Sequence, residues 1–406
     1  MRILHTADWH LGQRLADRSR EKEHRLFLDW LLATLQKEQI DVLIVAGDIF
    51  DMGNPPNYAR KQYYDFLRQS IKYCDNIVVV GGNHDSIANL DAPKELLKYF
   101  KIHVIGGACS NIADEVVEIK SSTNKLIGAI GAVPFLRERD IKAAVAGEVY
   151  KERVLRIKAG IRKHYETVMQ HLLPYQKQGY PVVATGHLFA AGSEQSDSEK
   201  EIHIGNRGRV EVEVFPKELD YVALGHIHKP QLVNGLDHIR YCGSPIPLSF
   251  SERDDYKQVL IVDVDKNGLQ NITVVPIPRR RRLIRLKGTF DQIQQKIVSY
   301  DFPTHELTAW LEVFVQIEEY EPELAERIKK LAEDKDLDIL SVRTIFINQK
   351  LNLDEQVATT YNLDDLKPIE VFRKKCDSDK VKTEDKEVLE STFFELLDWM
   401  KEREEG

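Results

Sequence analysis

The sequence predicts an α/β fold in which a β-sandwich is flanked by helices, followed by a small α+β domain and a helical C-terminal tail. Through the first two-thirds of the chain, short apolar runs alternate with amphipathic helical patterns, as is typical of sheets with helices on their faces. The length of 406 residues and the hydrophobic fraction of 42% are sufficient for two or three domains with cores of their own.

The first predicted domain, residues 1–276, combines helices with two groups of strands. One helix is expected over Glu23–Gln36, where apolar side chains recur at helical spacing, and a second from Pro56 to Ile71. The strands that alternate with helices are expected at Arg2–Leu4, Val42–Ala46, Ile77–Val80, Val182–Thr185 and Tyr221–Leu224. The strands expected to close a second sheet are Glu211–Val214, Arg240–Cys242, Val259–Asp263 and Ile272–Val275.

A domain boundary is predicted near Pro276–Pro278, and the pattern beyond it differs from the first domain. Residues 277–350 have the pattern of a compact βαβαβ unit. Its elements are expected at Leu283–Leu286, Phe290–Ile297, Leu311–Ile317, Pro322–Leu331 and Ile339–Ile347. The basic run Arg279–Arg282 at this border is typical of a solvated linker or strand edge, and contact with DNA is the alternative interpretation.

The last predicted region, residues 351–406, is helical in pattern and highly charged. Thr383, followed by two acidic residues, suits the start of a helix. An apolar stripe follows at helical spacing and consists of Leu389, Phe393, Leu396, Leu397 and Met400. A short isolated helix gains little stability in water, so the stripe is expected to be buried against its own domain or against a partner.

The charge balance limits how this chain can bind nucleic acid. It has 57 basic and 65 acidic residues and a net charge of −8, whereas a protein that coats nucleic acid by electrostatics alone is basic. Binding of DNA or RNA would therefore need metal ions, a local basic patch or a partner. The four cysteines are widely spaced, which argues against a disulfide framework and a cysteine zinc site. With no signal-peptide pattern and no apolar run near ~20 residues, we expect a soluble cytoplasmic protein without a membrane segment.

Five short blocks hold the residues that carry chemistry, and each follows a predicted strand. Because ligands gather at the carboxyl ends of strands in open α/β sheets, the blocks are expected to meet at one rim. Glycine precedes the key residue in four of them, which suits tight turns that direct side chains into a cleft. The blocks are Asp8-Trp9-His10, Gly47-Asp48-Ile49-Phe50-Asp51, Gly82-Asn83-His84-Asp85, Gly186-His187 and Gly225-His226-Ile227-His228.

The mixture of donors in these blocks indicates a pair of divalent ions. Imidazole suits zinc, iron and similar metals, while carboxylate and amide oxygens suit harder ions such as manganese. Roughly seven nitrogen and oxygen ligands are too many for one tetrahedral ion and fit two ions ~3.5–4 Å apart that share a carboxylate. Such a pair is suited to hydrolysing phosphate esters. Because the blocks contain no thiolate, two Mn²⁺ ions are favoured over zinc, with Mg²⁺ or another divalent ion as the alternative.

In this order, the blocks D-x-H, G-D-x-x-D, G-N-H-D, G-H and G-H-x-H resemble the calcineurin-like metallophosphoesterase family, whose β-sandwich is flanked by helices. Longer stretches resemble the SbcD family, the nuclease subunits of bacterial SbcC–SbcD complexes. These stretches are Arg2–Gln13, Val45–Asp51, Ala184–Leu188, Ala223–His228 and Tyr241–Phe250. The resemblance covers nearly the whole chain and implies that residues 277–350 are a capping domain and residues 351–406 bind an ATPase partner.

The resemblance also implies a role for each residue of the blocks. Asp48 would bridge the two metal ions. The other ligands would be Asp8, His10 and His228 for one ion and Asn83, His187 and His226 for the other. His84 would not be a ligand but would face the phosphate and help the leaving group depart.

One position departs from part of the family. Archaeal and eukaryotic relatives carry a histidine where this chain has Asp51, whereas phosphoprotein phosphatases have an aspartate there, paired with the histidine of the G-N-H motif. We therefore interpret Asp51 as the orienting partner of His84, which would raise the basicity of the imidazole.

The function implied by the resemblance is a manganese-dependent DNA nuclease for end processing, recombination and repair, with exonuclease action on duplex ends and endonuclease action on single strands and hairpins. Its implied partners are an SbcC-like ATPase, DNA and a second copy of this chain within a heterotetramer. Residues 56–71 and Leu90–Phe100 would contribute the homodimer contact, and the alternative is that Tyr63, Phe66, Leu67 and Ile71 are ordinary core. Two alternatives stay open: a metallophosphatase or phosphodiesterase for small substrates, which would not need the segment after Pro276, and a catalytically silent scaffold that binds DNA ends.

The remaining titratable residues have simpler interpretations. Asp85 is expected either to brace its own loop or to take part in the site. A histidine outside the five blocks is more often a satisfied core or surface residue than a ligand. We apply that interpretation to His5, His24, His103, His164, His171, His203, His238 and His305.

Overall fold

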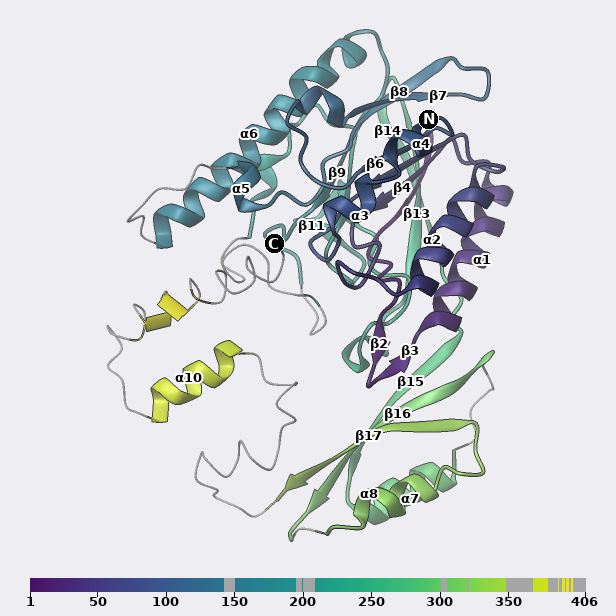
Figure 1. Cartoon of the computed structure of the whole chain (residues 1–406), viewed down its shortest axis with the longest axis vertical. Helices are drawn as coiled ribbons and strands as arrows, with labels where there is room; N and C mark the ends of the chain where they lie inside the picture. The colour runs from purple at the N-terminus through teal and green to yellow at the C-terminus, as the bar shows by residue number, and fades with distance from the viewer. Residues whose placement is uncertain are drawn as a thin grey trace. The chain divides into compact units, whose positions relative to one another are not determined.

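Figure 1 shows the computed structural model, which describes residues 1–141, 150–194, 199, 209–300, 305–319, 321–347 and 368–378, with residues 386, 389–390, 392–393 and 396. The chain divides into two units, Met1–Arg279 and Arg280–Gly406. The further division of the second unit at residue 350 remains a prediction. In the part of the chain that the structure describes, no helix is long and apolar enough to cross a membrane.

The first sheet of the N-terminal unit has the strand order β14-β13-β1-β4-β5-β6. Its strands are β1 (Arg2–Thr6), β4 (Val42–Ala46), β5 (Asn76–Val80), β6 (Ile102–Ile105), β13 (Gln258–Asp265) and β14 (Gly268–Pro276). Strands β1, β4, β5 and β6 are parallel, and β13 pairs antiparallel with β1. The strands predicted at Val259–Asp263 and Ile272–Val275 therefore extend the first sheet and do not close the second. That prediction was wrong because an apolar pattern specifies a strand and not its neighbour.

The second sheet has the order β11-β12-β10-β9-β8-β7. Its strands are β7 (Val116–Lys120), β8 (Leu126–Gly131), β9 (Val182–His187), β10 (Tyr221–Gly225), β11 (Gln231–Val233) and β12 (Leu236–Tyr241). The predicted strands at residues 182–185 and 221–224 are thus present, in the second sheet, and are parallel to each other. The segment predicted as a strand at Glu211–Val214 is instead a 3₁₀ turn, η3 (Val212–Val214). Four residues of alternation are too few to distinguish these two structures.

The two sheets pack face to face, and helices cover both outer faces (Figure 1). Helices α1 (Glu21–Glu38) and α2 (Asn57–Ser70) share a core with the first sheet, and α6 (Tyr150–Lys177) shares a core with the second. The shorter elements are β2 (Arg14–Leu15), β3 (Arg18–Ser19), α3 (Ile87–Asp91), α4 (Lys94–Lys98), η1 (Ile112–Glu115), α5 (Glu138–Ile141) and η4 (Phe250–Glu252). The predicted sandwich flanked by helices is confirmed.

The second unit contains the predicted βαβαβ arrangement. Three parallel strands, in the order β15-β16-β17, carry helices α7 and α8 on one face (Figure 1). The elements are β15 (Arg281–Gly288), α7 (Phe290–Val298), β16 (Leu307–Ile317), α8 (Leu324–Lys330) and β17 (Leu337–Phe346). The arginine run at the border is largely engaged within the chain, because Arg280 pairs with Glu306 at 2.7 Å and Arg281 stacks on Trp310.

The described part of the C-terminal tail supports its helical prediction. Helix α10 spans Pro368–Ser378, and Phe372 on this helix stacks on Phe393 of the predicted apolar stripe with ring centroids 4.3 Å apart. Leu389 and Leu396 of the stripe are 43% and 49% exposed. Leu397, Met400 and the predicted helix start at Thr383 lie outside the described residues. The stripe is therefore partly packed against α10 and partly exposed.

Candidate metal centre

The five sequence blocks meet at one end of the sandwich. Each follows the carboxyl end of a strand: β1, β4 and β5 in the first sheet, and β9 and β10 in the second. Among the described residues, three groups of side chains have donor atoms within 4.8 Å of one another. They are Asp8, His10 and His228; Asp48, His187 and His226; and His10, Asp48 and His84. The structure thus brings together every predicted ligand with a carboxylate or imidazole, in three groups that overlap at His10 and Asp48.

The backbone at these positions is strained. Asp8, His10, Asp48 and His226 have positive φ angles of 53°, 47°, 48° and 96°. A residue with a side chain rarely adopts this conformation, which costs on the order of 1–3 kcal/mol and persists where the surroundings enforce it. Main-chain hydrogen bonds from Asp8 N to Gly47 O and from His10 N to Asp48 O, both 3.0 Å, hold the first two blocks together. Four predicted ligands are thus among the residues with positive φ, which is consistent with a functional site.

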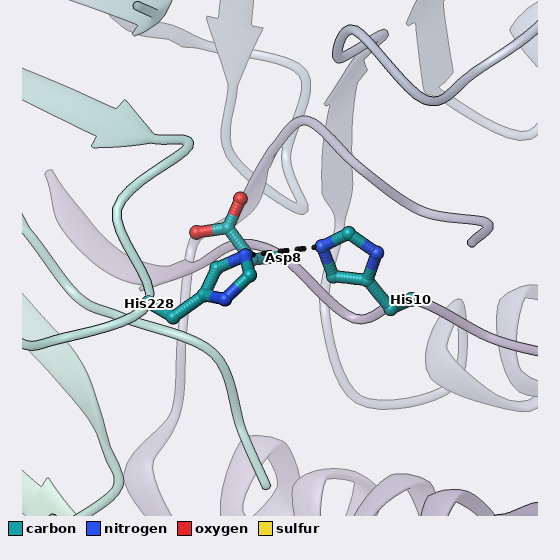
Figure 2. A group of neighbouring side chains, drawn as sticks. All are labelled: Asp8, His10 and His228. Carbon is teal, nitrogen blue, oxygen red and sulfur yellow. Dashed lines mark hydrogen bonds between the residues drawn. The ribbon is translucent and has the colours of Figure 1, made fainter. Parts of the chain in front are cut away.

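The first cluster consists of Asp8, His10 and His228, and Figure 2 shows the Asp8 carboxylate beside the two imidazole rings. The Nε2 atoms of His10 and His228 are 3.2 Å apart. His10 Nδ1 lies 3.2 Å from Asp51 Oδ1, and a carboxylate can only accept, so Nδ1 carries the proton and Nε2 a lone pair. The Oδ2 atom of Asp8 is buried and has no hydrogen-bond partner in the described structure. These donors converge as ligands of a cation do.

The second cluster consists of Asn83, His187 and His226. Asn83 Oδ1 lies 3.0 Å from His187 Nε2 and 3.1 Å from His226 Nδ1. His187 Nδ1 donates to the Ala46 carbonyl at 3.0 Å, so Nε2, which lies beside Asn83 Oδ1, is the nitrogen that a cation would bind in place of a proton. An amide oxygen and imidazole nitrogens without a thiolate suit Mn²⁺ and similar divalent ions.

Asp48 lies between the two clusters. Its Oδ2 atom is 3.6 Å from His10 Nε2 on one side and 3.3 Å from His187 Nε2 on the other. Its Oδ1 atom accepts a hydrogen bond from the main-chain N of His84 at 2.9 Å, which fixes the carboxylate. This is the position that a bridging ligand requires.

Two glycines allow this close packing. A Cβ on Gly47, whose φ is +90°, would lie 2.1 Å from His187 Nδ1. A Cβ on Gly82 would lie 2.1 Å from Asp48 Oδ1. Of the four block glycines only Gly47 has the positive φ of a tight turn, and at both Gly47 and Gly82 the absence of a side chain makes room for the predicted ligands.

The electrostatics of the centre favour bound cations. Burial raises the pKa of Asp8 to about 7. Burial also opposes ionisation of Asp48, but the nearby imidazoles of His187 and His84 hold its pKa well below its usual range. Burial would lower the pKa of His187, yet the Asp48 carboxylate raises it to about 9. Burial lowers the pKa of His226 well below its ordinary value and so favours the neutral ring that can ligate a metal. Two buried carboxylates within one cluster of rings are best compensated by divalent ions.

His84 and Asp51 make different contacts from those expected. His84 Nδ1 donates to the main-chain carbonyl of Asp51 at 2.7 Å, while the Asp51 carboxylate contacts His10 Nδ1. The orienting contact on His84 is thus made by the backbone of Asp51, and its side chain reaches a predicted ligand. The His84 ring is half-buried and lies edge-on to His10 with ring centroids 4.7 Å apart.

Asp85 braces the loops of the centre. Its carboxylate accepts hydrogen bonds from the main-chain N atoms of Ile49, Phe50 and Gly82 at 3.1, 3.0 and 2.9 Å. It therefore ties the second block to the third, as the simpler interpretation predicted.

Two histidines outside the blocks have partners in the core, as the simpler interpretation expected for them, whereas His24 is fully buried and neither ring nitrogen has a hydrogen-bond partner in the described structure. His5 Nδ1 lies 2.9 Å from the Tyr221 hydroxyl, and His164 Nε2 lies 2.7 Å from Glu115 Oε2.

Sequence reasoning missed a polar network behind His228. Glu252 Oε1 lies 3.4 Å from His228 Nδ1, and Lys257 Nζ donates to Glu252 Oε2 at 2.5 Å. Burial opposes ionisation of Glu252, but Lys257 and His228 hold the pKa of its carboxyl below its usual range. Glu199 Oε1 accepts from the main-chain N of His228 at 2.8 Å. Charged residues in irregular segments carry no sequence signal that distinguishes them from surface residues.

Comparisons with known proteins agree with this geometry. Residues 1–230 match the family model of the calcineurin-like phosphoesterases, and residues 279–380 match the SbcD_C model, described as the type 5 capsule protein repressor C-terminal domain. The SbcD protein of the SbcCD nuclease from Escherichia coli strain K12 is 35% identical over 401 residues, which are 98% of this chain and 98% of the relative. The chain belongs to the SbcD family. It lies within the calcineurin-like phosphoesterases, so the recognition of both families from the sequence is confirmed.

Other SbcD relatives are similar over shorter spans. The Bacillus subtilis strain 168 protein is 32% identical and covers 78% of this chain and 79% of its own. The Rhodobacter capsulatus protein is 35% identical over an alignment that covers 70% of this chain and 71% of that protein. A solved structure of a dimetal phosphatase from Danio rerio aligns with 68% of this chain and 99% of its own at 10% identity and a TM-score of 0.36, too low to add to the assignment.

Proposed function

We propose that this chain hydrolyses phosphodiester bonds in DNA at a pair of divalent ions, with Mn²⁺ preferred, as the nuclease component of an SbcCD-type complex. Membership of the SbcD family makes it a metal-dependent nuclease. The observation that carries the two-metal proposal is the position of Asp48 Oδ2, 3.6 Å from His10 in one cluster and 3.3 Å from His187 in the other.

The ions would be held by the two clusters. Asp8, His10 and His228 would hold the first ion, Asn83, His187 and His226 would hold the second, and Asp48 would serve both. When bound, the ions supply positive charge to the phosphate and lower the pKa of the attacking water. The chain would orient the imidazole ligands, because the Asp51 carboxylate fixes the tautomer of His10 and the Ala46 carbonyl fixes that of His187.

His84 is the proposed general acid. Because its Nδ1 proton is donated to the Asp51 carbonyl, Nε2 is the nitrogen that gains and loses a proton. The ring is half-buried, and protonated Nε2 would transfer its proton to the departing DNA oxygen. Asp51 would support the site through two groups, its carbonyl on His84 and its carboxylate on His10.

The proposed macromolecular partners are an SbcC-type ATPase, DNA and a second copy of the chain. The net charge of −8 makes strong unaided DNA binding unfavourable, so assembly with the ATPase would supply affinity for duplex ends, hairpins and single strands. Leu389 and Leu396 are exposed on the tail and suit the ATPase contact. A homodimer contact is supported by exposed apolar side chains on and beside α2 and α4, namely Tyr64, Ile71, Tyr73, Leu96, Tyr99 and Phe100.

A cleavage assay tests this function. Linear duplex DNA and a small phosphodiester are incubated with the full chain and Mn²⁺, alone and with the ATPase, and Asp48→Asn serves as the inactive control. We expect Mn²⁺-dependent cleavage of both substrates, with duplex cleavage stimulated by the ATPase and ATP. Hydrolysis of the small ester without any cleavage of DNA would instead identify a small-substrate phosphodiesterase, and DNA binding without cleavage of either would identify a scaffold.

A further inference from the structure

His228 stands apart from the other donors of the first cluster. Asp8 and His10 follow β1 in the first sheet, whereas His228 follows β10 in the second. Its main chain is anchored by the Ser244 N–H and the Lys257 ammonium, which donate to its carbonyl at 3.1 and 3.0 Å. The position of the ring then depends on what contacts its Nδ1 atom.

We propose that Glu252 is a positioning residue whose carboxylate accepts the Nδ1 proton of His228 and so directs the Nε2 lone pair to the first metal ion. The inference rests on the two-metal function proposed above. Glu252 Oε1 lies 3.4 Å from Nδ1, and both side chains are almost fully buried. A carboxylate only accepts hydrogen bonds, so this contact selects the tautomer with a lone pair on Nε2, the atom that faces His10 Nε2 at 3.2 Å.

Lys257 determines which oxygen of Glu252 faces the histidine. Its ammonium donates to Glu252 Oε2 at 2.5 Å, and the main-chain N of Leu248 donates to the same oxygen at 3.2 Å. The Ser244 hydroxyl is a further contact of Oε2 at 3.3 Å. With Oε2 engaged by these donors, Oε1 is turned to His228. The buried ion pair of Lys257 and Glu252 therefore fixes the orientation of the carboxylate, with Oε1 facing the predicted ligand His228.

Replacement of Glu252 by glutamine gives a specific expectation. The amide has one oxygen, and the Lys257 ammonium requires an acceptor, so the oxygen stays with Lys257 and the NH₂ group turns to His228 Nδ1. That nitrogen must then accept, the ring proton moves to Nε2, and Nε2 can no longer ligate a metal. Lys257→Met removes the charged donor to the amide oxygen and leaves the longer contact from the Leu248 main-chain N at 3.2 Å, so the oxygen can face Nδ1 again in a fraction of the molecules.

The test is the Mn²⁺ stoichiometry of the purified full chain, measured by equilibrium dialysis. For Glu252→Gln we expect one of the two ions to bind ~10–100-fold more weakly, which is the usual effect of losing a partner behind a ligand, while the other ion keeps its affinity. In Glu252→Gln/Lys257→Met the first ion should bind more tightly than in Glu252→Gln but more weakly than in the wild type, because this variant also loses the Lys257 contact on the His228 carbonyl. Unchanged affinity for both ions in Glu252→Gln, or no recovery in the double variant, would overturn the proposal.

Glu115→Gln is the matched control, because Glu115 is a buried carboxylate that pairs with His164 Nε2 at 2.7 Å away from the predicted ligands. It should lower the melting temperature and leave two-ion binding intact.

If Glu252→Gln alone fails to fold, Glu252→Leu/Lys257→Met is compared with Glu252→Gln/Lys257→Met, since neither leaves an unpaired buried charge. Only the leucine variant lacks an acceptor and should lose the first ion, so equal binding by the two would refute the inference. A wild-type chain that binds fewer than two ions would instead refute the two-metal function.

Discussion

Substitution of His84 is the clearest way to distinguish an effect on metal binding from an effect on catalysis. Replacing it by alanine removes the imidazole but keeps the main-chain N–H that donates to Asp48 Oδ1 at 2.9 Å. The seven proposed ligands all come from other residues, so both ions should remain bound. We therefore expect His84→Ala to keep metal affinity and lose turnover.

The size of the loss follows from the proposed proton transfer. A positioned general acid contributes ~10²–10⁴-fold to the rate, equivalent to about 2.7–5.4 kcal/mol in the activation free energy at about 1.36 kcal/mol per factor of ten. The cost to folding should be small, because the ring is half-buried and its Nδ1 hydrogen bond goes to a main-chain carbonyl, that of Asp51. Almost all of the effect should therefore appear in kcat.

The assay combines Mn²⁺ titration of the purified variant with steady-state cleavage of a small phosphodiester. Loss of one ion from His84→Ala would make His84 a ligand and refute the proposed role. Asp51→Ala is the companion variant, because it keeps the carbonyl on His84 and removes the carboxylate from His10 Nδ1. For Asp51→Ala, loss of the carboxylate contact with His10 predicts ~10–100-fold weaker binding of one ion. A reduced kcat with normal metal affinity would favour the Asp51 carboxylate as the orienting partner of His84.

Three further variants test the residues that support the site and the role of the C-terminal tail. Asp85→Ala leaves three buried main-chain N–H groups without their acceptor and should lower the free energy of unfolding by at least ~1–3 kcal/mol, the cost of one such group, in a denaturant titration. Gly47→Ala places a Cβ 2.1 Å from His187 Nδ1 and should selectively weaken binding of the second ion in calorimetry, whereas unchanged affinity would contradict the packing. A chain ending at Asp379 should bind Mn²⁺ and hydrolyse a small phosphodiester but fail to co-purify with the ATPase; normal co-purification would exclude the tail as the contact.

The sequence was sufficient to predict the centre because the chemistry lies in contiguous blocks. Each block follows a strand, and parallel strands bring their carboxyl ends to the same edge, so Asp8 and Asp48 could be placed together without knowledge of the whole fold. The positive φ of the same residues could not be predicted, because it depends on contacts between blocks such as Asp8 N to Gly47 O.

The parts that were missed depend on distant partners. The pattern of β13 specifies a buried strand, but its pairing with β1 joins segments more than 250 residues apart. The resemblance indicated a side-chain contact between Asp51 and His84, and the contact on His84 Nδ1 comes from the main-chain carbonyl of Asp51. Neither Lys257 nor Glu252 carries a local sequence signal of burial, and the two are 6% and 0% exposed. Local patterns specify elements and motifs, and non-local packing decides which atoms of those motifs meet.

The central claim is that Asp48 joins two ions in one centre. Its most direct test is electron paramagnetic resonance of the Mn²⁺-loaded wild type and of Asp48→Asn, with bound metal quantified on the same samples. We predict two Mn²⁺ per wild-type chain with the spectrum of a coupled pair, and loss of the coupling together with at least one ion in the variant, because the amide removes the negative charge that lies beside both His10 and His187. Full occupancy with unchanged coupling in Asp48→Asn, or a wild-type chain that holds one isolated ion, would contradict the account.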